Sequence, residues 1–315
     1  MRSKGLIFFT FAVAVFAVLE AEQTSAQDQI HLAQCQGDSS LPIVAQRVER
    51  DRGIKVTWDT LGSSEVKAKL EAGLASGNSF YDGIWACPLE PLQELFDSGA
   101  FMPASSYTAN RPPGEFYRPD QAWYPVTLDV GVVCVGSRMS NDVVRAAIET
   151  DPSVLLNTSF QGRVGFYDPV RSDTGYNWLA SFAQSLGTGG LERFAQDFAE
   201  QAKPVFEAGC DQVVDNEIDV AFSTWFDAFD VADNLDIVVP GNTWGIPYVF
   251  ALLASSDVPD AASALIDAVR QDAVQQEVGK LGEVVMPPSD LSISLQTKSR
   301  SFNTRIRPAP SSLPD

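Results

Sequence analysis

Short apolar strands and amphipathic helices alternate along the first hundred residues, and this alternation restricts the fold more than any other feature of the sequence. The expected strands cover residues 30–35, 54–60 and 81–86, and helices are expected at residues 39–53, 63–77 and 88–99. Strands that alternate with helices in this way favour a parallel sheet covered by helices. We therefore predict an α/β fold.

Two long strand-like segments follow, at residues 126–136 (VTLDVGVVCVG) and after the turn that begins at residue 241 (GNTWGIPYVFALLASS). A strand that leaves one sheet and enters another has such a length. A second α/β set lies between them, and a helix pair is expected at residues 259–279. We predict two lobes with a ligand cleft between them, lobe 1 from residues 27–128 plus about 246–285 and lobe 2 from about 129–245. Residues 102–124 are predicted to be a surface loop and 286–315 an irregular tail of uncertain placement.

The N-terminus has the pattern of a secretory signal peptide. Arg2 and Lys4 precede an apolar run at residues 5–19, and Thr24-Ser25-Ala26 fits a small-x-small cleavage site. We expect residues 1–26 to be removed and the mature chain to be periplasmic, where disulfides are permitted.

Charge and missing motifs exclude several functions. The formal net charge of −19 opposes binding to nucleic acid or to an anionic membrane surface. The sequence has no phosphate-binding loop, no zinc-protease motif and no nucleophile elbow. A catalytic triad would depend on His31 alone, the single histidine, which we interpret as structural. We predict a protein that is not an enzyme and that has neither a cofactor nor a metal site.

Four segments resemble a known family in order and spacing. They are YDGIWACPLEPLQELFDSGAFMP, VTLDVGVVCVG, GRVGFYDPVRSDTGYNWLASFAQSLG, and IDVAFSTWFDAF followed by VVPGNTWGIPYVFALL. Across residues 30 to 285 the chain is similar to type II periplasmic solute-binding proteins of ABC importers, in the group that holds ferric-iron, spermidine/putrescine, thiamine and phosphonate binders. The resemblance implies a monomer that closes over a small solute by a hinge and delivers it to a membrane permease.

In that family, strand ends and helix starts from both lobes reach the cleft. Ser172, Asp173 and Thr174 lie at such a helix start, where unpaired backbone N–H groups can bind a ligand, or where these residues simply cap the helix. Asp173 adds a negative charge, which disfavours a bare phosphate-like ligand. The other candidates in segments expected to reach the cleft are Gln36, Asp38, Trp85 and Tyr176.

The resemblance also bears on the class of solute. Iron-binding members present adjacent tyrosines in the segment that here is AFSTWFDAF, often with a histidine in the first loop, and this chain has neither. Trp225 and Trp244 lie where polyamine and thiamine binders place aromatic rings, and Asp129 and Asp227 add carboxylates. We favour an organic cation or amine, with ferric iron or a phosphonate as alternatives. The two tryptophans could instead pack between the lobes, and Asp227 could be an ordinary surface residue.

The four cysteines allow three full pairings. Cys35 and Cys87 each follow a strand that ends at the predicted cleft, so we expect a disulfide between them. Cys134 is expected to be a buried free thiol, and Cys210 can also be free. A different class of function is an exported thiaminase-like enzyme with Cys35 or Cys87 as its nucleophile. A third class is a ligand-sensing module for a separate receptor chain.

Overall fold

The computed structural model of the chain describes residues 29–35, 38–111, 116, 120–169, 172–186, 198, 200, 205–206, 208–286, 292–296 and 301–308. The predicted signal peptide and Gln36 lie outside these ranges. Within them, no helix combines the length and the apolar character needed to cross a membrane.

The elements are numbered along the chain, with η for 3₁₀ helices. They are β1 (Gln29–Cys35), α2 (Ser40–Arg52), β2 (Lys55–Leu61), α3 (Ser63–Ser76), β3 (Gly83–Pro88), η1 (Glu90–Leu92), α4 (Gln93–Asp97), η2 (Ala104–Ser106), β4 (Tyr124–Val135), α5 (Asp142–Thr150), η4 (Pro152–Leu156), η5 (Thr158–Phe160), β5 (Val164–Phe166), α6 (Asp173–Leu186), β6 (Val205–Phe206), α8 (Cys210–Val214), β7 (Val220–Thr224), α9 (Trp225–Phe229), β8 (Asp236–Val238), β9 (Asn242–Leu252), α10 (Pro259–Val269), α11 (Asp272–Gly279), β10 (Val284–Val285), β11 (Ser292–Gln296) and β12 (Ser301–Pro308).

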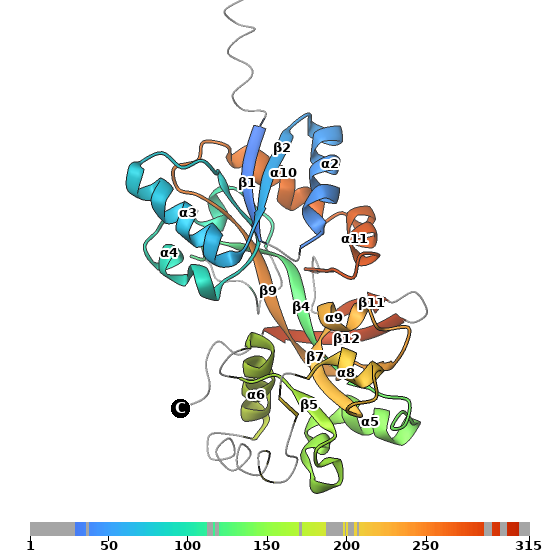
Figure 1. Ribbon diagram of the computed structural model, residues 1–315. Helices are drawn as coiled ribbons and strands as arrows, with labels where there is room; N and C mark the ends of the chain where they lie inside the picture. The colour runs from blue at the N-terminus through green and yellow to red at the C-terminus, as the bar shows by residue number, and fades with distance from the viewer. Residues whose placement is uncertain are drawn as a thin grey trace, which may run out of the picture.

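The predicted parallel arrangement is confirmed in the upper half of the molecule in Figure 1, where β1 pairs in parallel with both β2 and β3. Successive side chains of a strand point to opposite faces. Leu32 therefore packs in the cluster that includes α2 and α10, and Ala33 packs in the cluster that includes α3 and α4. Both faces of this sheet are thus covered by helices, as Figure 1 shows for α2 and α3.

Strand β4 connects the two halves of the molecule. Its first part, from Tyr124 to Val130, pairs antiparallel with β9. Its last part, from Gly131 to Val135, pairs with β7, and its final three residues also pair with β8 in the second sheet. The expectation of a strand that passes from one sheet to another is therefore confirmed. Strand β9 runs beside β4 in Figure 1, and its other edge pairs with β3 near one end and β12 near the other.

The lower half has its own aromatic core. Trp178 of α6 makes an edge-on contact with Phe222 of β7 at 5.0 Å and with Trp244 of β9 at 5.5 Å, measured between ring centres. Each of these three side chains is at most 2% exposed. Burial of side chains of this size stabilises the fold by roughly 1.5–3 kcal/mol each. Each half thus has a hydrophobic core, while the predicted lobe boundaries remain a prediction.

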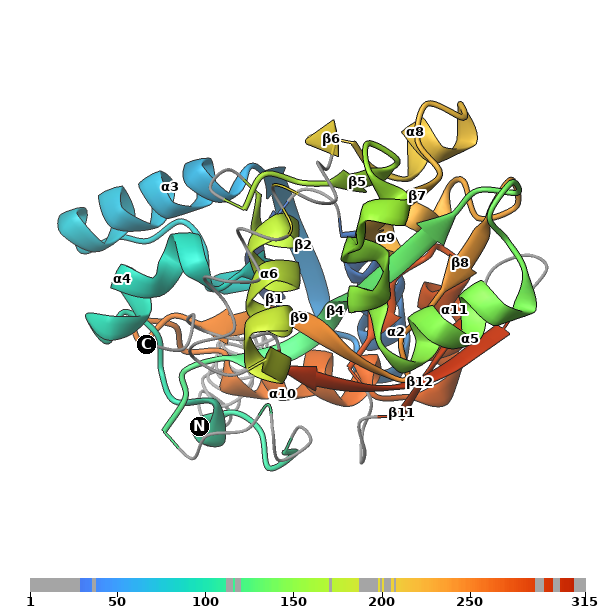
Figure 2. The same ribbon diagram turned by 90° about the horizontal axis from the view of Figure 1, so that it is seen from below.

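Two expectations about irregular segments were wrong. The C-terminal tail forms the hairpin β11–β12, and β12 lies parallel to the start of β9 (Figure 2). The segment 102–124 is not simply a surface loop, because Tyr107 and Phe116 are 4% and 3% exposed and pack into the cores. Within the predicted second α/β set, residues 190–202 (GLERFAQDFAEQA) have a helical pattern, and of these only Phe198 and Glu200 are described.

Candidate functional site

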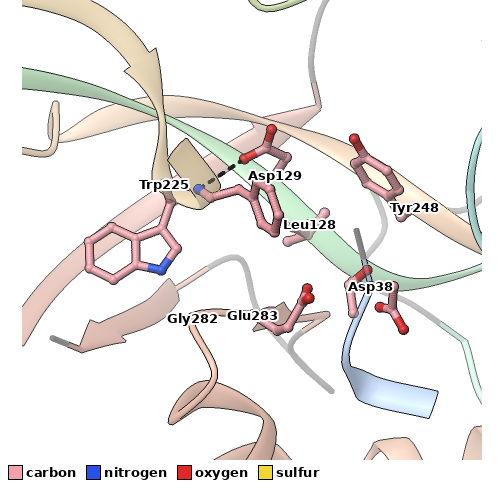
Figure 3. A pocket seen from close by; sticks show the side chains of 9 residues that line it. Asp38, Leu128, Asp129, Trp225, Tyr248, Gly282 and Glu283 are labelled. Atoms are coloured by element: carbon pink, nitrogen blue, oxygen red, sulfur yellow. Dashed lines mark hydrogen bonds between the residues drawn. The ribbon is translucent and has the colours of Figure 1, made fainter. Parts of the chain in front are cut away.

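A cavity of about 100 Å³ lies where the two halves meet. Strand β4, helix α9, strand β9, the loop before α2 and the turn before β10 all contribute to its wall, as Figure 3 shows. The lining residues are Asp38, Thr127, Leu128, Asp129, Trp225, Phe226, Tyr248, Gly282 and Glu283.

Asp38 is held at the cavity by several hydrogen bonds. Its Oδ1 accepts from the backbone N–H groups of Ser40, at 3.1 Å, and of Leu41, at 3.3 Å, so the side chain caps the start of α2. The indole Nε1 of Trp85 donates to the same oxygen at 3.2 Å and to Ser40 Oγ at 3.0 Å. Burial raises the pKa of Asp38 despite these bonds, which act in the opposite direction.

Trp85 is placed by an irregularity in β3. The pairing of β3 with β9 shifts between Ile84 and Cys87, and Ala86 has a φ of 49°. A bulge of this kind redirects neighbouring side chains, and a positive φ is uncommon for a residue with a Cβ atom. The next residue, Cys87, forms a disulfide with Cys35. That predicted disulfide is confirmed, and it ties β3 to the end of β1 just before the loop that carries Asp38.

Asp129 lies on β4, half-buried, and faces the start of α9. Its Oδ1 accepts a hydrogen bond from the backbone N–H of Phe226 at 3.5 Å (Figure 3). Burial, followed by the negative charge of Asp227, raises the pKa of Asp129 to about 7, although a hydrogen bond from Thr224 opposes this shift. Asp227 itself accepts hydrogen bonds from Ser223 Oγ at 3.3 Å and from the Tyr167 hydroxyl at 3.5 Å.

Glu283 supplies a further carboxylate from the turn between α11 and β10. Its Oε1 accepts a hydrogen bond from the backbone N–H of Ser39 at 2.9 Å. Burial, followed by the charge of Asp38, raises the pKa of Glu283 to about 7. In Figure 3 its side chain lies between those of Trp225 and Asp38, on the other side of the space from Asp129.

The cavity is acidic and partly aromatic. In the described part of the chain, none of the nine lining residues is Lys or Arg, so none of these side chains neutralises the three carboxylates. Phe226 is 52% exposed and can face a ligand, whereas Trp225 is only 2% exposed and forms part of the wall. Within the described ranges, no three His, Cys, Asp or Glu side chains lie close enough together to hold a metal ion.

The structure brings together some of the predicted site residues but not others. Asp38, Asp129 and Trp225 line the cavity, while Trp85 and Asp227 contact lining residues. Trp244 is fully buried in the lower core. A packing role, the alternative to ligand contact, therefore describes it better.

None of the described side chains at the start of α6 lines the cavity. The backbone N–H of Gly175 donates to Ser172 Oγ at 3.4 Å, which is a capping contact. Thr174 and Tyr176 are half-buried and are not among the lining residues, and the side chain of Asp173 is outside the described part of the structure. The helix start instead packs against the backbone of Tyr167, whose hydroxyl reaches Asp227.

Six lining residues were missed by the sequence analysis. They are Thr127, Leu128, Phe226, Tyr248, Gly282 and Glu283. Leu128 and Phe226 directly adjoin predicted residues, and Thr127 is two positions from Asp129, so all three could have been found by widening the predicted segments. Tyr248 lies in a family-like segment in which no feature singled it out, and Gly282 and Glu283 follow no motif.

The remaining two cysteines were predicted wrongly. Cys134 of β4 and Cys210 at the start of α8 form a second disulfide. All four cysteines are therefore oxidised, and neither Cys35 nor Cys87 has a thiol to act as a nucleophile. This contradicts the alternative of a cysteine-dependent enzyme.

Comparisons with known proteins agree with this geometry. The pattern of a family described as bacterial extracellular solute-binding protein matches residues 118–300. No curated protein sequence matches the chain.

Among solved structures, a ferric binding protein from Campylobacter jejuni is similar over 82% of this chain and 86% of its own, with 18% identity and a TM-score of 0.64. A Trichodesmium protein in complex with iron and citrate is similar over 89% and 93%, with 13% identity and a TM-score of 0.69. The substrate-binding protein of a spermidine/putrescine ABC transporter from Streptococcus pneumoniae is similar over 79% and 80%, with 15% identity and a TM-score of 0.60. At these identities the likeness establishes the fold.

Proposed function

The chain belongs to the bacterial extracellular solute-binding protein family, and we propose that it captures a small cation in the cavity between its two halves. The fold is that of the type II periplasmic binding proteins, and the function is that of a non-enzymatic solute-binding protein of ABC transport. Delivery of the solute to a membrane permease, a periplasmic location and a monomeric state remain part of the proposal.

One observation carries the choice of a cation. Asp38, Asp129 and Glu283 line one small cavity, and none of the described residues that line it with them is a lysine or an arginine. Removing a charged carboxylate from water costs free energy unless a positive charge lies beside it, and a bound cation would supply that positive charge. The same wall disfavours a phosphonate, because an anion would add to the repulsion.

The aromatic side chains favour an organic cation or amine. The exposed face of Phe226 and the ring of Tyr248 can contact alkylammonium groups, and the carboxylates can accept their hydrogen bonds. The absence of a three-ligand cluster among the described residues also makes a bare metal ion less favourable here.

Ferric iron is the second candidate, and the similar structures favour it over an amine. Two of the proteins compared above are described as a ferric binder and as a complex with iron and citrate, against one spermidine/putrescine binder. Carboxylate oxygens and the Tyr248 hydroxyl are hard ligands that suit a hard cation. The segment 220–229 still has no tyrosine.

Thermal unfolding against a ligand panel tests the proposal. The panel contains putrescine, spermidine, choline, betaine, thiamine, ferric citrate, phosphate and aminoethylphosphonate. A ligand present at 100 times its dissociation constant should stabilise the protein by about 2.7 kcal/mol, which raises the melting temperature by several degrees. The Asp129→Asn variant should show a smaller shift in melting temperature, because two of the three lining carboxylates remain, and Asp59→Asn, whose carboxylate contacts Tyr81 away from the cavity, should keep the full shift.

The outcomes separate the candidates. Stabilisation by an amine supports the favoured ligand, and stabilisation by ferric citrate alone selects iron. A response only to phosphate or aminoethylphosphonate would contradict a cation site while leaving the solute-binding role in place.

A further inference from the structure

Acidic groups surround the cavity from several elements. Asp129 of β4, Asp38 of the loop before α2 and Glu283 of the turn before β10 line it. Asp227 of α9 does not line it, but its charge acts on Asp129. Asp227 is also influenced by the charge of Asp211 on α8.

The other titratable groups near these carboxylates are phenols. Tyr248 on β9 lines the cavity, and Tyr167 after β5 donates a hydrogen bond to Asp227. Neither phenol carries a positive charge. Among the described residues, the charged groups that face the cavity are therefore all of one sign.

We propose that the ligand-free cavity binds protons and that an entering cation displaces them into solvent, so that solute capture and proton release are a single exchange. This inference rests on the proposed function as a cation binder. In this exchange the O–H bond of each carboxyl group breaks, its electron pair stays on the carboxylate oxygen, and the proton passes to water as the cation takes its place.

The physical reason is competition for the same negative charge. Without a ligand, burial and mutual repulsion favour the neutral acids, and the pKa values of Asp129 and Glu283 are each raised to about 7. At pH 7 the two groups together therefore hold about one proton. A cation between them favours the charged forms, and by reciprocity the protons weaken the binding of the cation.

The pH dependence follows from this competition. Two groups with pKa values near 7 are almost fully protonated at pH 6 and almost fully ionised at pH 8. A cation that requires both to be ionised should thus bind about 100-fold more weakly at pH 6 than at pH 8. Above pH 8 the affinity should become independent of pH.

Calorimetric titration with spermidine tests the exchange. Measurements at pH 7 in two buffers of different ionisation enthalpy give the number of protons released, and we expect about one per bound cation. Dissociation constants measured from pH 6 to 8.5 give the pH dependence of the affinity. The 100-fold change expected between pH 6 and 8 should fall to about tenfold in Asp129→Asn and in Glu283→Gln, because each variant keeps one of the two titrating groups. The Asp59→Asn variant should retain the full dependence, and choline serves as a second probe.

A ligand-free measurement tests the other half of the exchange. A carboxyl group with a folded pKa of about 7 and an unfolded pKa near 4 binds more protons in the folded protein, so stability should fall as pH rises from 4 to 7 and then level off. Each of the two cavity variants should flatten this slope in chemical unfolding experiments.

The two proposals fail in different ways. Spermidine or choline binding with no proton release and no pH dependence would overturn the exchange and leave the cation site intact. Failure of every cation in the panel to bind at any pH would overturn the proposed function and the exchange with it.

Discussion

Trp85 affects the cavity without lining it. Its indole donates to Asp38 and Ser40, and the side chain is fully buried between the sheet and α2. A hydrogen bond to a charged group contributes about 1.5–3 kcal/mol, so Trp85→Phe should weaken binding of the cation by about tenfold or more. Calorimetry with the ligand selected from the panel measures this loss.

The control for this variant is Trp58→Phe, since Trp58 lies on β2 and does not line the cavity. It removes the same indole N–H elsewhere in the same sheet and should leave the affinity unchanged. Equal affinity of Trp85→Phe and the native protein would contradict a positioning role for Trp85.

Gly282 is required for two separate reasons. Its φ is 84°, and a Cβ atom there would lie 2.5–3.0 Å from ring atoms of Phe229 on α9. Gly282→Ala should therefore destabilise the protein by the cost of a left-handed conformation, about 1–2 kcal/mol, plus a further cost of about 1–3 kcal/mol for the clash. Because α9 also carries Phe226, affinity for the cation should fall as well. Chemical unfolding and calorimetry measure the two effects.

Gly53→Ala is a matched control for the backbone effect. Gly53 has a φ of 72° at the end of α2, and a Cβ atom there would have open space around it. This variant should lose only about 1–2 kcal/mol and no affinity. If both variants lose the same stability, the contact with Phe229 has no energetic role.

Single residues also show how far sequence reasoning reaches. Asp38 and Asp129 were predictable because polar residues at the ends of apolar strands and in family-like segments stand out. Glu283 was not, because it belongs to a turn that is far from Asp38 in sequence and approaches Ser39 only through tertiary packing. Trp244 has the residue type of a ligand contact, and only its burial against Trp178 identifies it as core.

At the scale of elements, the disulfide between Cys134 and Cys210 joins α8 to β4, the strand that connects the two sheets. It closes a loop with a sequence separation of 76 residues. Replacing both cysteines by alanine should destabilise the protein by about 3–4 kcal/mol, chiefly because the unfolded chain gains freedom. Thermal unfolding of the double variant measures the loss.

The other disulfide provides the comparison. Replacing both Cys35 and Cys87 by alanine should cost a similar amount, and it should also weaken cation binding because these residues flank the loop of Asp38 and the bulge that places Trp85. Identical effects of the two double variants on affinity would contradict this difference.

Strand β12 could not be predicted from the sequence. Its alternation is short and carries polar and charged residues, so the sequence favoured an irregular tail. Its pairing partner is the start of β9, about sixty residues earlier in the chain, and such a register is fixed by the packed structure rather than by local pattern. The parallel strands β1, β2 and β3 were predictable because each alternates with a helix.

At the scale of the whole molecule, β4 and β9 run side by side from one half to the other, and the cavity lies where they do so. The length of β4 could be read from the sequence, and its passage from one sheet to the other was predicted from that length. The contact between Gly282 before β10 and Phe229 on α9 was not, because it depends on how the two halves approach each other.

This arrangement predicts that a ligand changes the overall shape. Carboxylates on both sides of the cavity repel one another in the ligand-free protein, and a cation bound between them should draw the two halves together by rotation about β4 and β9. Small-angle X-ray scattering at pH 8 should therefore give a smaller radius of gyration with the selected cation than without it. The Asp129→Asn/Glu283→Gln double variant lacks both charges and should give the same radius with and without the cation. A native protein that binds the cation in calorimetry but keeps its radius of gyration would show that capture occurs within a rigid cavity, and closure by a hinge would then be wrong.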